Sequence, residues 1–302
     1  MSALRILLLG ADGQVGWELR RALLPLGDVL PCTRAQADFS DLPALRALLE
    51  REQPHVIVNA AAYTAVDQAE REPELAQRIN AQAPAVLAEH AAAHGAWLLH
   101  YSTDYVFDGR KPAPYVETDA PNPQSAYGRS KLEGERAMAA SGCRHVILRT
   151  SWVYAARGGN FAKTMLRLAA EREQLRVIAD QFGAPTSAEL IADVTALIIQ
   201  RLRHDPAPER LSGLYHLSAQ GATSWHGYAR WVIEYARQRG WALRCAPEAV
   251  QAIATADYSL PAPRPANSRL DCTKLQTTFD LHLPPWQTQV QRLIDELTPH
   301  TP

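Results

Sequence analysis

The stretch Leu4-Arg5-Ile6-Leu7-Leu8-Leu9-Gly10-Ala11-Asp12-Gly13-Gln14-Val15-Gly16 decides the fold. Its first six residues are nearly all apolar and end at a glycine, as in a buried parallel strand. The glycines at positions 10, 13 and 16 lead directly into a helical pattern that runs to about residue 24. A strand, a glycine-rich turn and a helix in this order let the backbone approach a pyrophosphate at the positive end of the helix. We therefore expect a dinucleotide site at this turn, although its spacing is G-x-x-G-x-x-G and not the usual G-x-G-x-x-G.

The rest of the first half repeats the alternation of strand and helix. Apolar strands are expected at about 28–32, 55–59, 96–101 and 145–149. They are separated by helices at about 43–52 and 74–94 and by a helix that bears Tyr127 and Lys131, after a proline-rich loop at 112–123. Five strands with intervening helices predict an α/β fold with a right-handed, doubly wound parallel sheet of the Rossmann type.

Beyond Thr150 the pattern becomes less regular, with helices at about 161–172, 188–203 and 225–238 and short strands at 176–178 and 214–217. We expect a second, smaller α/β substrate domain interleaved with the end of the first. The predicted dinucleotide-binding domain covers 1–150 and about 186–214, and the substrate domain about 151–185 and 215–302. Residues 261–269 are rich in proline and contain two arginines, so this segment is either a linker or an anion-binding loop.

The composition excludes several classes of protein. A length of 302 residues favours two domains, and a formal net charge of -1 argues against a nucleic-acid or anionic-membrane partner. No apolar run approaches membrane-spanning length. The four cysteines lie far apart without a C-x-x-C pair, so they suggest neither disulfides nor a zinc site, and a cytoplasmic location fits best.

The cofactor preference is expected to depend on the end of the second strand. It ends in Thr33-Arg34, and an arginine there meets the 2'-phosphate of NADPH, whereas NADH would favour an acidic residue. We therefore expect NADPH as the cofactor. The alternative is NADH, and Arg34 would then be an ordinary surface residue. Asp38 either contacts the adenine or serves as a turn residue before the next helix.

A tyrosine four residues ahead of a lysine marks the predicted catalytic helix. Tyr127 and Lys131 share one helical face at this spacing. Lys131 is one of only four lysines among 31 basic residues, so its position suggests chemistry that a guanidinium does not perform. The alternative is the solvated face of an ordinary helix. Thr103, at the carboxyl end of the fourth strand, is the natural second partner for a substrate oxygen.

Several stretches resemble the dTDP-4-dehydrorhamnose reductase family of the extended short-chain dehydrogenase/reductase superfamily. The YxxxK motif belongs to the whole superfamily, so the specific markers are STDYVFDG, DQFGAPT and RPANSRL. The resemblance covers nearly the whole chain and rests on GADGQVGWE (10–18), NAAAYTAVD (59–67), HYSTDYVFDG (100–109), YGRSK (127–131), RTSWVY (149–154), NFAKTMLRLA (160–169), DQFGAPT (180–186) and RPANSRL (264–270).

The resemblance implies the last step of dTDP-L-rhamnose synthesis, with a dTDP-sugar as substrate. Tyr127 would give a proton to the 4-keto oxygen, and Lys131 together with the oxidised nicotinamide would lower the pKa of Tyr127. Lys131 would also bind the nicotinamide ribose, and Thr103 would stabilise charge on the reacting oxygen. Asp104 and Trp152 would contact the sugar nucleotide. The cofactor would be bound by Tyr127 and Lys131 together with Gly10, Gly13, Gln14, Val15, Gly16, Thr33, Arg34, Asp38, Phe39, Ala61, Ala62, Tyr63 and Thr64. Tyr63 stands where several relatives have histidine.

The resemblance also implies a metal and leaves alternatives for the function. Some members bind Mg²⁺ at a homodimer contact through three glutamates, and Glu18, Glu189 and Glu296 match them, although scattered carboxylates are usually solvated. One alternative function is that of another extended short-chain enzyme, such as an epimerase or dehydratase of a different sugar nucleotide. The other is a non-catalytic nucleotide-binding subunit similar to the regulatory subunit of methionine adenosyltransferase.

Overall fold

The central element of the molecule is a six-stranded parallel sheet. The computed structural model describes residues 3–258 and 260–298, and its main sheet has the strand order β10-β5-β4-β3-β1-β2. All neighbouring strands are parallel. The order reverses between β1 and β3, and ligands bind outside the carboxyl ends of the strands at such a switch point. The strands are β1 Leu4–Leu9, β2 Gly27–Cys32, β3 Val56–Asn59, β4 Trp97–Thr103, β5 Arg144–Thr150 and β10 Gly213–His216.

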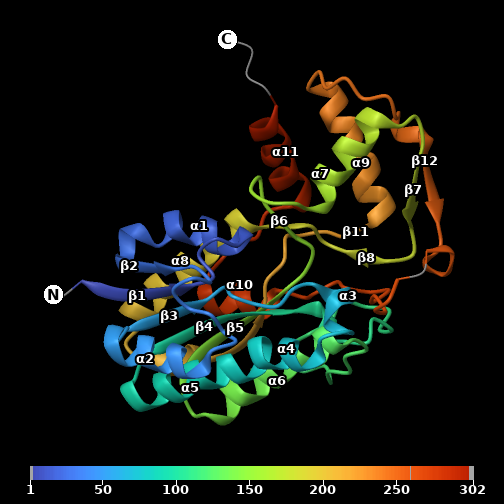
Figure 1. Cartoon of the computed structure of the whole chain (residues 1–302). Helices are drawn as coiled ribbons and strands as arrows, with labels where there is room; N and C mark the ends of the chain where they lie inside the picture. Colours follow the sequence, from blue (N-terminus) through green and yellow to red (C-terminus); the bar gives the residue numbers. More distant parts are fainter. Residues whose placement is uncertain (1–2, 259, 299–302) are drawn as a thin grey trace.

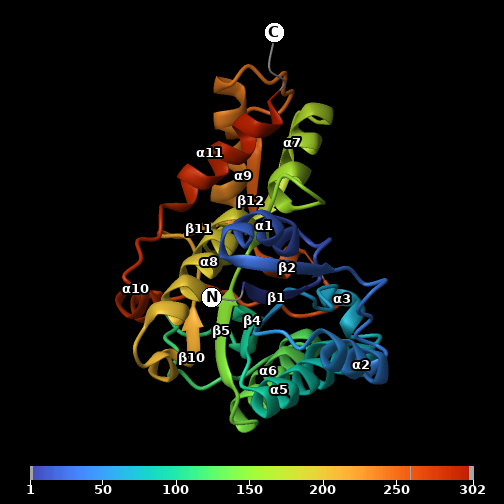
Figure 2. The same cartoon turned by 90° about the vertical axis from the view of Figure 1, so that its left-hand side faces the viewer.

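Helices cover both faces of this sheet, which confirms the doubly wound α/β prediction (Figure 1, Figure 2). Alternate side chains of β1 feed two separate cores. Ile6 and Leu8 belong to the core under α1 and α8, whereas Leu7 and Leu9 belong to the core under α2 and α5. Burial on both faces explains why the strand is continuously apolar. The covering helices are α1 Gln14–Ala22, α8 Ala188–His204, α2 Leu42–Glu52, α5 Ala83–His94 and α6 Ala126–Ala140.

The long helix expected at 74–94 is interrupted. After α3 (Val66–Ala69), α4 covers Pro73–Gln77, and a π-helical turn (Arg78–Gln82) joins it to α5. The turn places Asn80 where its side chain accepts a hydrogen bond from the backbone N–H of Tyr63 (2.8 Å) and donates one to Oγ of Ser130 (3.0 Å). The irregular turn therefore ties the segment after β3 to α6, and π turns of this kind often occur beside functional sites.

The C-terminal part forms a smaller α/β unit, at the upper right of Figure 1. Its parallel pair β7 and β12 packs against α9, which also contacts α7 and α11. Helix α9 begins and ends where the sequence predicted, whereas α11 and β12 were not predicted. The elements are β6 Val153–Tyr154, α7 Phe161–Glu171, β7 Leu175–Ile178, β8 Phe182–Gly183, β9 Thr186–Ser187, β11 Thr223–Ser224, α9 Trp225–Gln238, β12 Val250–Ile253, α10 Thr273–Phe279 and α11 Trp286–Leu297.

The chain returns to the main sheet after entering this unit. β10 pairs with β5 as the sixth strand and ends at His216, and α10 packs against β10. Part of the range 215–302 therefore lies beside the sheet, and the exact domain boundaries stay a proposal. Within the described residues, no helix is both long and apolar enough to cross a membrane.

A buried ion pair attaches α6 to the sheet. Arg149 on β5 donates hydrogen bonds from Nε and Nη2 to the two carboxylate oxygens of Glu135 on α6, at 2.8 and 2.5 Å. Only 2% of the Arg149 side chain and 6% of the Glu135 side chain are exposed. A buried ion pair contributes little net stability, but removal of one partner leaves an uncompensated charge.

We predict that Glu135→Gln lowers the free energy of unfolding by about 3–5 kcal/mol, because the guanidinium of Arg149 stays buried without its counter-charge. The matched control is Glu133→Gln on the same helix, where the pair with Arg136 is exposed. That change should cost less than about 1 kcal/mol. Urea unfolding followed by circular dichroism measures both values, and equal losses would show that the buried pair has no special role.

Candidate active site

The glycine-rich turn closes the carboxyl end of β1 and begins α1. Gly10 has a φ of +76°, and a Cβ there would lie 2.6 Å from the backbone nitrogen of Ala61. A Cβ on Gly16 would lie 2.0 Å from the carbonyl oxygen of Gly10, so both glycines are required by the fold itself. At Gly13 the nearest atom to such a Cβ is 3.4 Å away, which is an ordinary contact. The packing of the protein therefore does not require a glycine at position 13. A glycine there leaves room for a ligand to approach the backbone.

The predicted cofactor residues gather around a cavity of about 280 Å³ beside this turn. Its position at the switch point between β1 and β3 and its size suit the adenosine half of a dinucleotide. The predicted residues that line it are Gly10, Gly13, Arg34, Asp38, Phe39, Ala61, Ala62 and Tyr63.

The other predicted cofactor residues do not line this cavity. Gly16 packs against Gly10, Gln14 donates a hydrogen bond to the carbonyl oxygen of Gly159 (3.3 Å), and Thr33 bonds with the side chain of Gln36. Their roles, with those of Val15 and Thr64, stay predictions.

Arg34 and Asp38 form the open rim of the cavity. The side chain of Arg34 is 74% exposed and its Nε lies 3.6 Å from Asp38 Oδ2, so most of its N–H groups are free for a phosphate. Hydrogen bonds from the backbone N–H and hydroxyl of Ser40 lower the pKa of Asp38. The backbone carbonyl oxygen of Asp38 also accepts a hydrogen bond from the backbone N–H of Asp41 (3.0 Å), in the turn that precedes α2. This contact agrees with the alternative that Asp38 is a turn residue.

Tyr127 lies in the first turn of α6, which begins where the Ser125 hydroxyl accepts a hydrogen bond from Gly128 N (3.1 Å). Burial raises the pKa of Tyr127 to about 12, and the Thr103 hydroxyl opposes this shift. The expected lowering by Lys131 and the oxidised nicotinamide is not produced by Lys131 alone, because burial dominates and the ammonium of Lys131 is directed to Tyr101 and His100. A raised pKa keeps the phenol protonated at neutral pH, which suits a proton donor.

Lys131 is almost completely buried, with 1% of its surface exposed. Its Nζ donates a hydrogen bond to the carbonyl oxygen of Tyr101 (2.6 Å) and lies 3.2 Å from Nε2 of His100. The other ring nitrogen of His100 lies 2.9 Å from Nδ2 of Asn59. Burial lowers the pKa of Lys131 to about 8, against the opposing charge of Glu135. His100 and Asn59 therefore hold Lys131 in place beneath the predicted nicotinamide site.

Asp104 follows Thr103 at the carboxyl end of β4. Burial raises the pKa of Asp104 to about 6, and the hydroxyl groups of Ser268 and Thr103 oppose the shift. Oδ1 of Asp104 accepts a hydrogen bond from Thr103 (3.1 Å), whereas its buried Oδ2 has no partner among the described residues. An unpaired buried oxygen costs free energy in the protein alone, so this atom is available to a polar ligand group.

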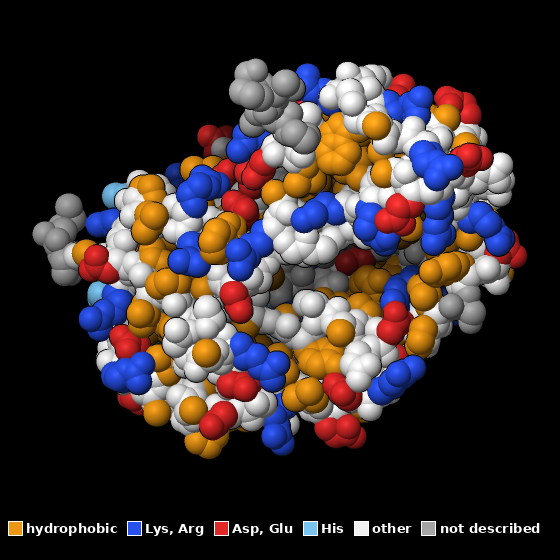
Figure 3. All heavy atoms as spheres, turned by 45° about the horizontal axis from the view of Figure 1, so that its top comes forward, with side chains coloured by type: hydrophobic (Ala, Val, Ile, Leu, Met, Phe, Trp, Pro, Cys, Tyr) orange, Lys and Arg blue, Asp and Glu red, His pale blue; other side chains and the backbone are white. Residues whose placement is uncertain are grey.

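A larger cavity, of about 780 Å³, lies toward the C-terminal unit. Figure 3 shows the surface hollowed between the two parts of the molecule. Tyr105 lines the cavity and contacts the ring of Tyr127 edge to face, with the centroids 5.6 Å apart. Tyr105 therefore connects the larger cavity with the predicted catalytic helix.

Trp152 forms an aromatic wall of this cavity. Its backbone is in the left-handed region (φ 48°), and its ring stacks on Trp225 with the centroids 3.5 Å apart. A Cβ on Gly183, in the DQFGAPT stretch, would lie 2.6 Å from the Trp152 ring. The glycine therefore makes room for the indole, which is held between Gly183 and Trp225.

Three arginines also line the larger cavity: Arg172, Arg176 and Arg264. Arg264 is held by Asp67 at 2.8 Å, whereas the other two form no ion pair within residues 3–258 and 260–298. Two free guanidinium groups beside an aromatic wall suit an anion with a planar group, such as a nucleoside diphosphate.

The three glutamates expected to bind magnesium do not form a metal site in the single chain. Burial and the charge of Glu189 raise the pKa of Glu18, and Glu296 adds to this effect. Glu189 is already paired with Arg292, whose guanidinium donates hydrogen bonds of 2.7 and 3.1 Å. Among the described residues, the only three metal-ligating side chains whose ligand atoms all lie within 4.8 Å of one another are elsewhere. The expectation was a site shared between two chains at a homodimer contact, so the magnesium site stays a prediction.

Comparison with known proteins identifies the family. The model of the RmlD substrate binding domain matches residues 4–298. The dTDP-4-dehydrorhamnose reductase of Shigella flexneri is 51% identical over 298 residues, which cover 97% of this chain and 98% of the relative. This chain belongs to the dTDP-4-dehydrorhamnose reductase family.

Two solved structures of the reductase family have the same fold. A dTDP-4-dehydrorhamnose reductase from Clostridium acetobutylicum has a TM-score of 0.88 at 35% identity, with 97% of this chain and 99% of that chain covered. The enzyme from Bacillus anthracis, solved in complex with NADP, has a TM-score of 0.87 at 35% identity, with 98% and 100% covered. Family membership confirms the resemblance inferred from the motifs.

Sequence reasoning missed several residues at the site. His100 and Glu135 were not predicted, although a histidine within a buried strand and a glutamate on the Tyr127 helix were visible signals. Arg172 and Arg176 were missed because nothing in the sequence shows that α7 and β7 face the cavity.

We predict that Gly13→Ala leaves folding nearly intact, with a change below about 1 kcal/mol, because its Cβ meets no protein atom closely. The same change should weaken NADPH binding roughly tenfold or more, because the methyl group occupies the path of the pyrophosphate. Fluorescence titration with NADPH measures this effect. Gly16→Ala is the control and should destabilise the fold itself. Unchanged NADPH affinity in Gly13→Ala would contradict the placement of the cofactor.

Proposed function

We propose that this chain reduces the 4-keto group of dTDP-4-dehydro-L-rhamnose with NADPH and so produces dTDP-L-rhamnose. One observation carries the proposal: a buried, protonated Tyr127 lies near an arginine-lined cavity, on the helix whose Lys131 lies beneath the expected nicotinamide. Membership of the reductase family supports the substrate, and the NADP complex of a relative supports the cofactor.

The protein's own residues position the keto group and supply the proton. NADPH, when bound, supplies the hydride for the sugar C4. Tyr127 holds a proton on its phenolic oxygen because burial keeps its pKa at about 12, and this proton goes to the 4-keto oxygen as the new C–H bond forms. Thr103 lies beside the phenol and stabilises the charge that develops on the same oxygen. Lys131, which is held by Tyr101 and His100, would bind the nicotinamide ribose.

The larger cavity provides a place for the sugar nucleotide. Arg172 and Arg176 are the groups that would bind its diphosphate, because no protein carboxylate of the described chain pairs with them. Trp152 lines this cavity, and the unpaired Oδ2 of Asp104 would accept a hydrogen bond from a sugar hydroxyl. The cavity volume of about 780 Å³ is within the usual range for such ligands.

Other expectations from the sequence stay predictions. A cytoplasmic location, a homodimer and the absence of nucleic-acid partners follow from composition and resemblance. Binding of Mg²⁺ by Glu18, Glu189 and Glu296 also stays a prediction, and it would require Arg292 to release Glu189.

We predict that the purified chain oxidises NADPH when it is given dTDP-4-dehydro-L-rhamnose, and that Tyr127→Phe lowers kcat by about 10²–10⁴-fold because the proton donor is removed. Phenylalanine keeps the ring, so the Kd for NADPH should change less than about threefold. Loss of absorbance at 340 nm measures the rate.

These measurements distinguish the reductase from the alternative functions. Wild-type protein that binds NADPH but does not turn over would favour the non-catalytic subunit or a different sugar nucleotide. A wild-type rate in Tyr127→Phe would contradict the role of the phenol.

We also predict that Arg34→Asp shifts cofactor preference toward NADH. The change replaces a phosphate-binding cation with a group that accepts hydrogen bonds from a free 2'-hydroxyl. Because Arg34 is largely exposed, we expect roughly a tenfold fall in the ratio of kcat/KM for NADPH to that for NADH. Arg46→Asp is a control, because this exposed arginine lies on α2 and does not line the cavity. An unaltered ratio in Arg34→Asp would show that Arg34 does not contact the phosphate.

A further inference from the structure

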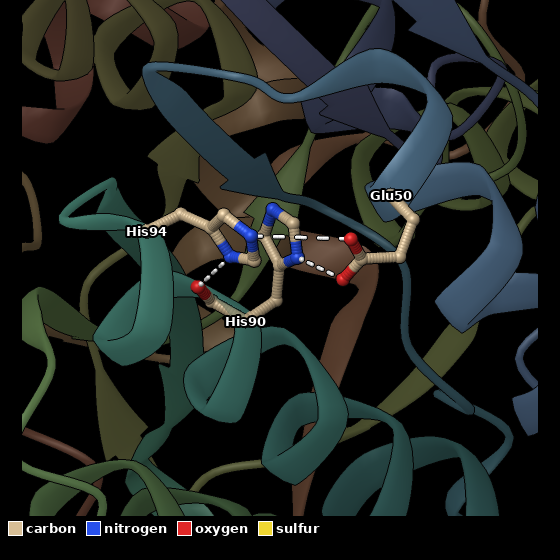
Figure 4. A group of neighbouring side chains, drawn as sticks. All are labelled: Glu50, His90 and His94. Carbon is tan, nitrogen blue, oxygen red and sulfur yellow. Dashed lines mark hydrogen bonds and ion pairs between the residues drawn. The ribbon is translucent and has the colours of Figure 1, made fainter.

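Three side chains of types that bind metal ions lie close together on the outer helices, away from the cavities described above. Glu50 comes from the last turns of α2, and His90 and His94 come from α5 (Figure 4). Both helices lead directly into strands, so their C-terminal ends lie near the amino ends of β3 and β4. The proposed active site is at the opposite, carboxyl edge of the sheet.

The two histidines and the glutamate converge. His90 and His94 are four residues apart on one helical face, and their rings stack with the centroids 4.1 Å apart. Glu50 Oε1 lies 3.3 Å from Nδ1 of His90, and Glu50 Oε2 lies 3.9 Å from Nε2 of His94. The three ligand atoms all lie within 4.8 Å of one another. Four-coordinate zinc with bonds of about 2.0–2.1 Å needs ligand atoms roughly 3.4 Å apart, so small side-chain rotations suffice.

The hydrogen bonds of His94 already give it the form that binds a metal. Its Nδ1 donates a hydrogen bond to the carbonyl oxygen of His90 (3.0 Å), so the proton is on Nδ1. The lone pair of Nε2 is then free and, as Figure 4 shows, turned toward Glu50. Metal-binding histidines commonly have their second nitrogen fixed in this way.

His90 is the buried member of the group, with 6% of its surface exposed. Its Nδ1 faces Glu50, and its Nε2 is buried without a hydrogen-bond partner among the described residues. The hydrogen bond between Nδ1 and this carboxylate is weak, because its length is 3.3 Å and the Glu50 side chain is 63% exposed. Nδ1 is therefore only weakly engaged, and it is the atom of His90 that is available to a metal ion.

The surroundings favour a cation. The three residues line a surface groove of about 350 Å³ between the two helices, together with Arg46 and Glu89. Arg46 is paired with Glu89 at 2.7 Å, so its positive charge is neutralised. Glu50 remains as the uncompensated charge of the groove.

We propose that Glu50, His90 and His94 bind one divalent transition-metal ion, Zn²⁺, at the surface between α2 and α5. Two imidazoles and one carboxylate are ligands typical of zinc and its neighbours in the first transition row, and not of magnesium. Three protein ligands leave a position for water, which the open groove supplies. The ion joins α2 to α5 and stabilises the folded chain, because a ligand that binds only the folded state raises its stability.

The test is zinc binding by the full chain after removal of metals with a chelator. We expect isothermal titration with ZnCl₂ to show one ion bound per chain, and thermal unfolding to show a saturable rise in Tm. MgCl₂ should give neither effect.

The variants His94→Ala and Glu50→Gln should each weaken zinc binding at least tenfold and abolish the rise in Tm. Both positions are partly exposed, and NADPH affinity serves as the check that each variant is folded. His204→Ala, which removes an exposed histidine from the end of α8, is the control and should bind zinc as the wild type does. The proposal is wrong if the wild type binds no zinc at 0.1 mM, or if His94→Ala and Glu50→Gln bind it as tightly as the control.

Discussion

The burial of Lys131 is the constraint on which the arrangement of the site depends. An ammonium that is 1% exposed is tolerated only where the protein supplies close polar partners, and here Tyr101 and His100 supply them from β4. The helix that carries Lys131 must therefore lie directly against the sheet. Two glycines also let this helix approach neighbouring turns closely: a Cβ on Gly128 would lie 2.2 Å from Tyr105 O, just after β4, and one on Gly134 would lie 2.2 Å from Asn80 O in the π-helical turn. The ion pair of Arg149 with Glu135 holds the same helix from β5. The position of Tyr127, one turn before Lys131, follows from these contacts.

Two cavities on the carboxyl side of the sheet give this helix its function. One lies at the switch point between β1 and β3, where the backbone of Gly13 is open to a ligand. The other is larger, carries the stacked pair of Trp152 and Trp225, and has two arginines without acidic partners in the described chain. We propose that the cofactor binds in the first cavity and the sugar nucleotide in the second, which Tyr105 connects with Tyr127. Membership of the dTDP-4-dehydrorhamnose reductase family agrees with this division.

The features that the sequence predicted are those with a local cause. Neighbouring residues alone determine what three patterns predict: the apolar run Leu4–Leu9, the glycines that follow it, and the spacing of Tyr127 and Lys131. The sheet is parallel, as predicted. The features that it did not predict depend on distant contacts. The π turn at 78–82 exists because Asn80 bonds with Tyr63 and Ser130, and the left-handed backbone of Trp152 depends on space made by Gly183. The raised pKa of Tyr127 in the protein alone was not predicted, because it comes from burial, which is a property of the folded chain.

The central claim is that hydride moves from the nicotinamide to C4 of the sugar at this site. The most direct measurement is NMR of the product after reaction with NADPH that carries deuterium at both C4 positions. The account predicts one deuterium at sugar C4 and a hydroxyl group on the same carbon. A product without deuterium at C4, or no product from folded protein that binds NADPH, would contradict it.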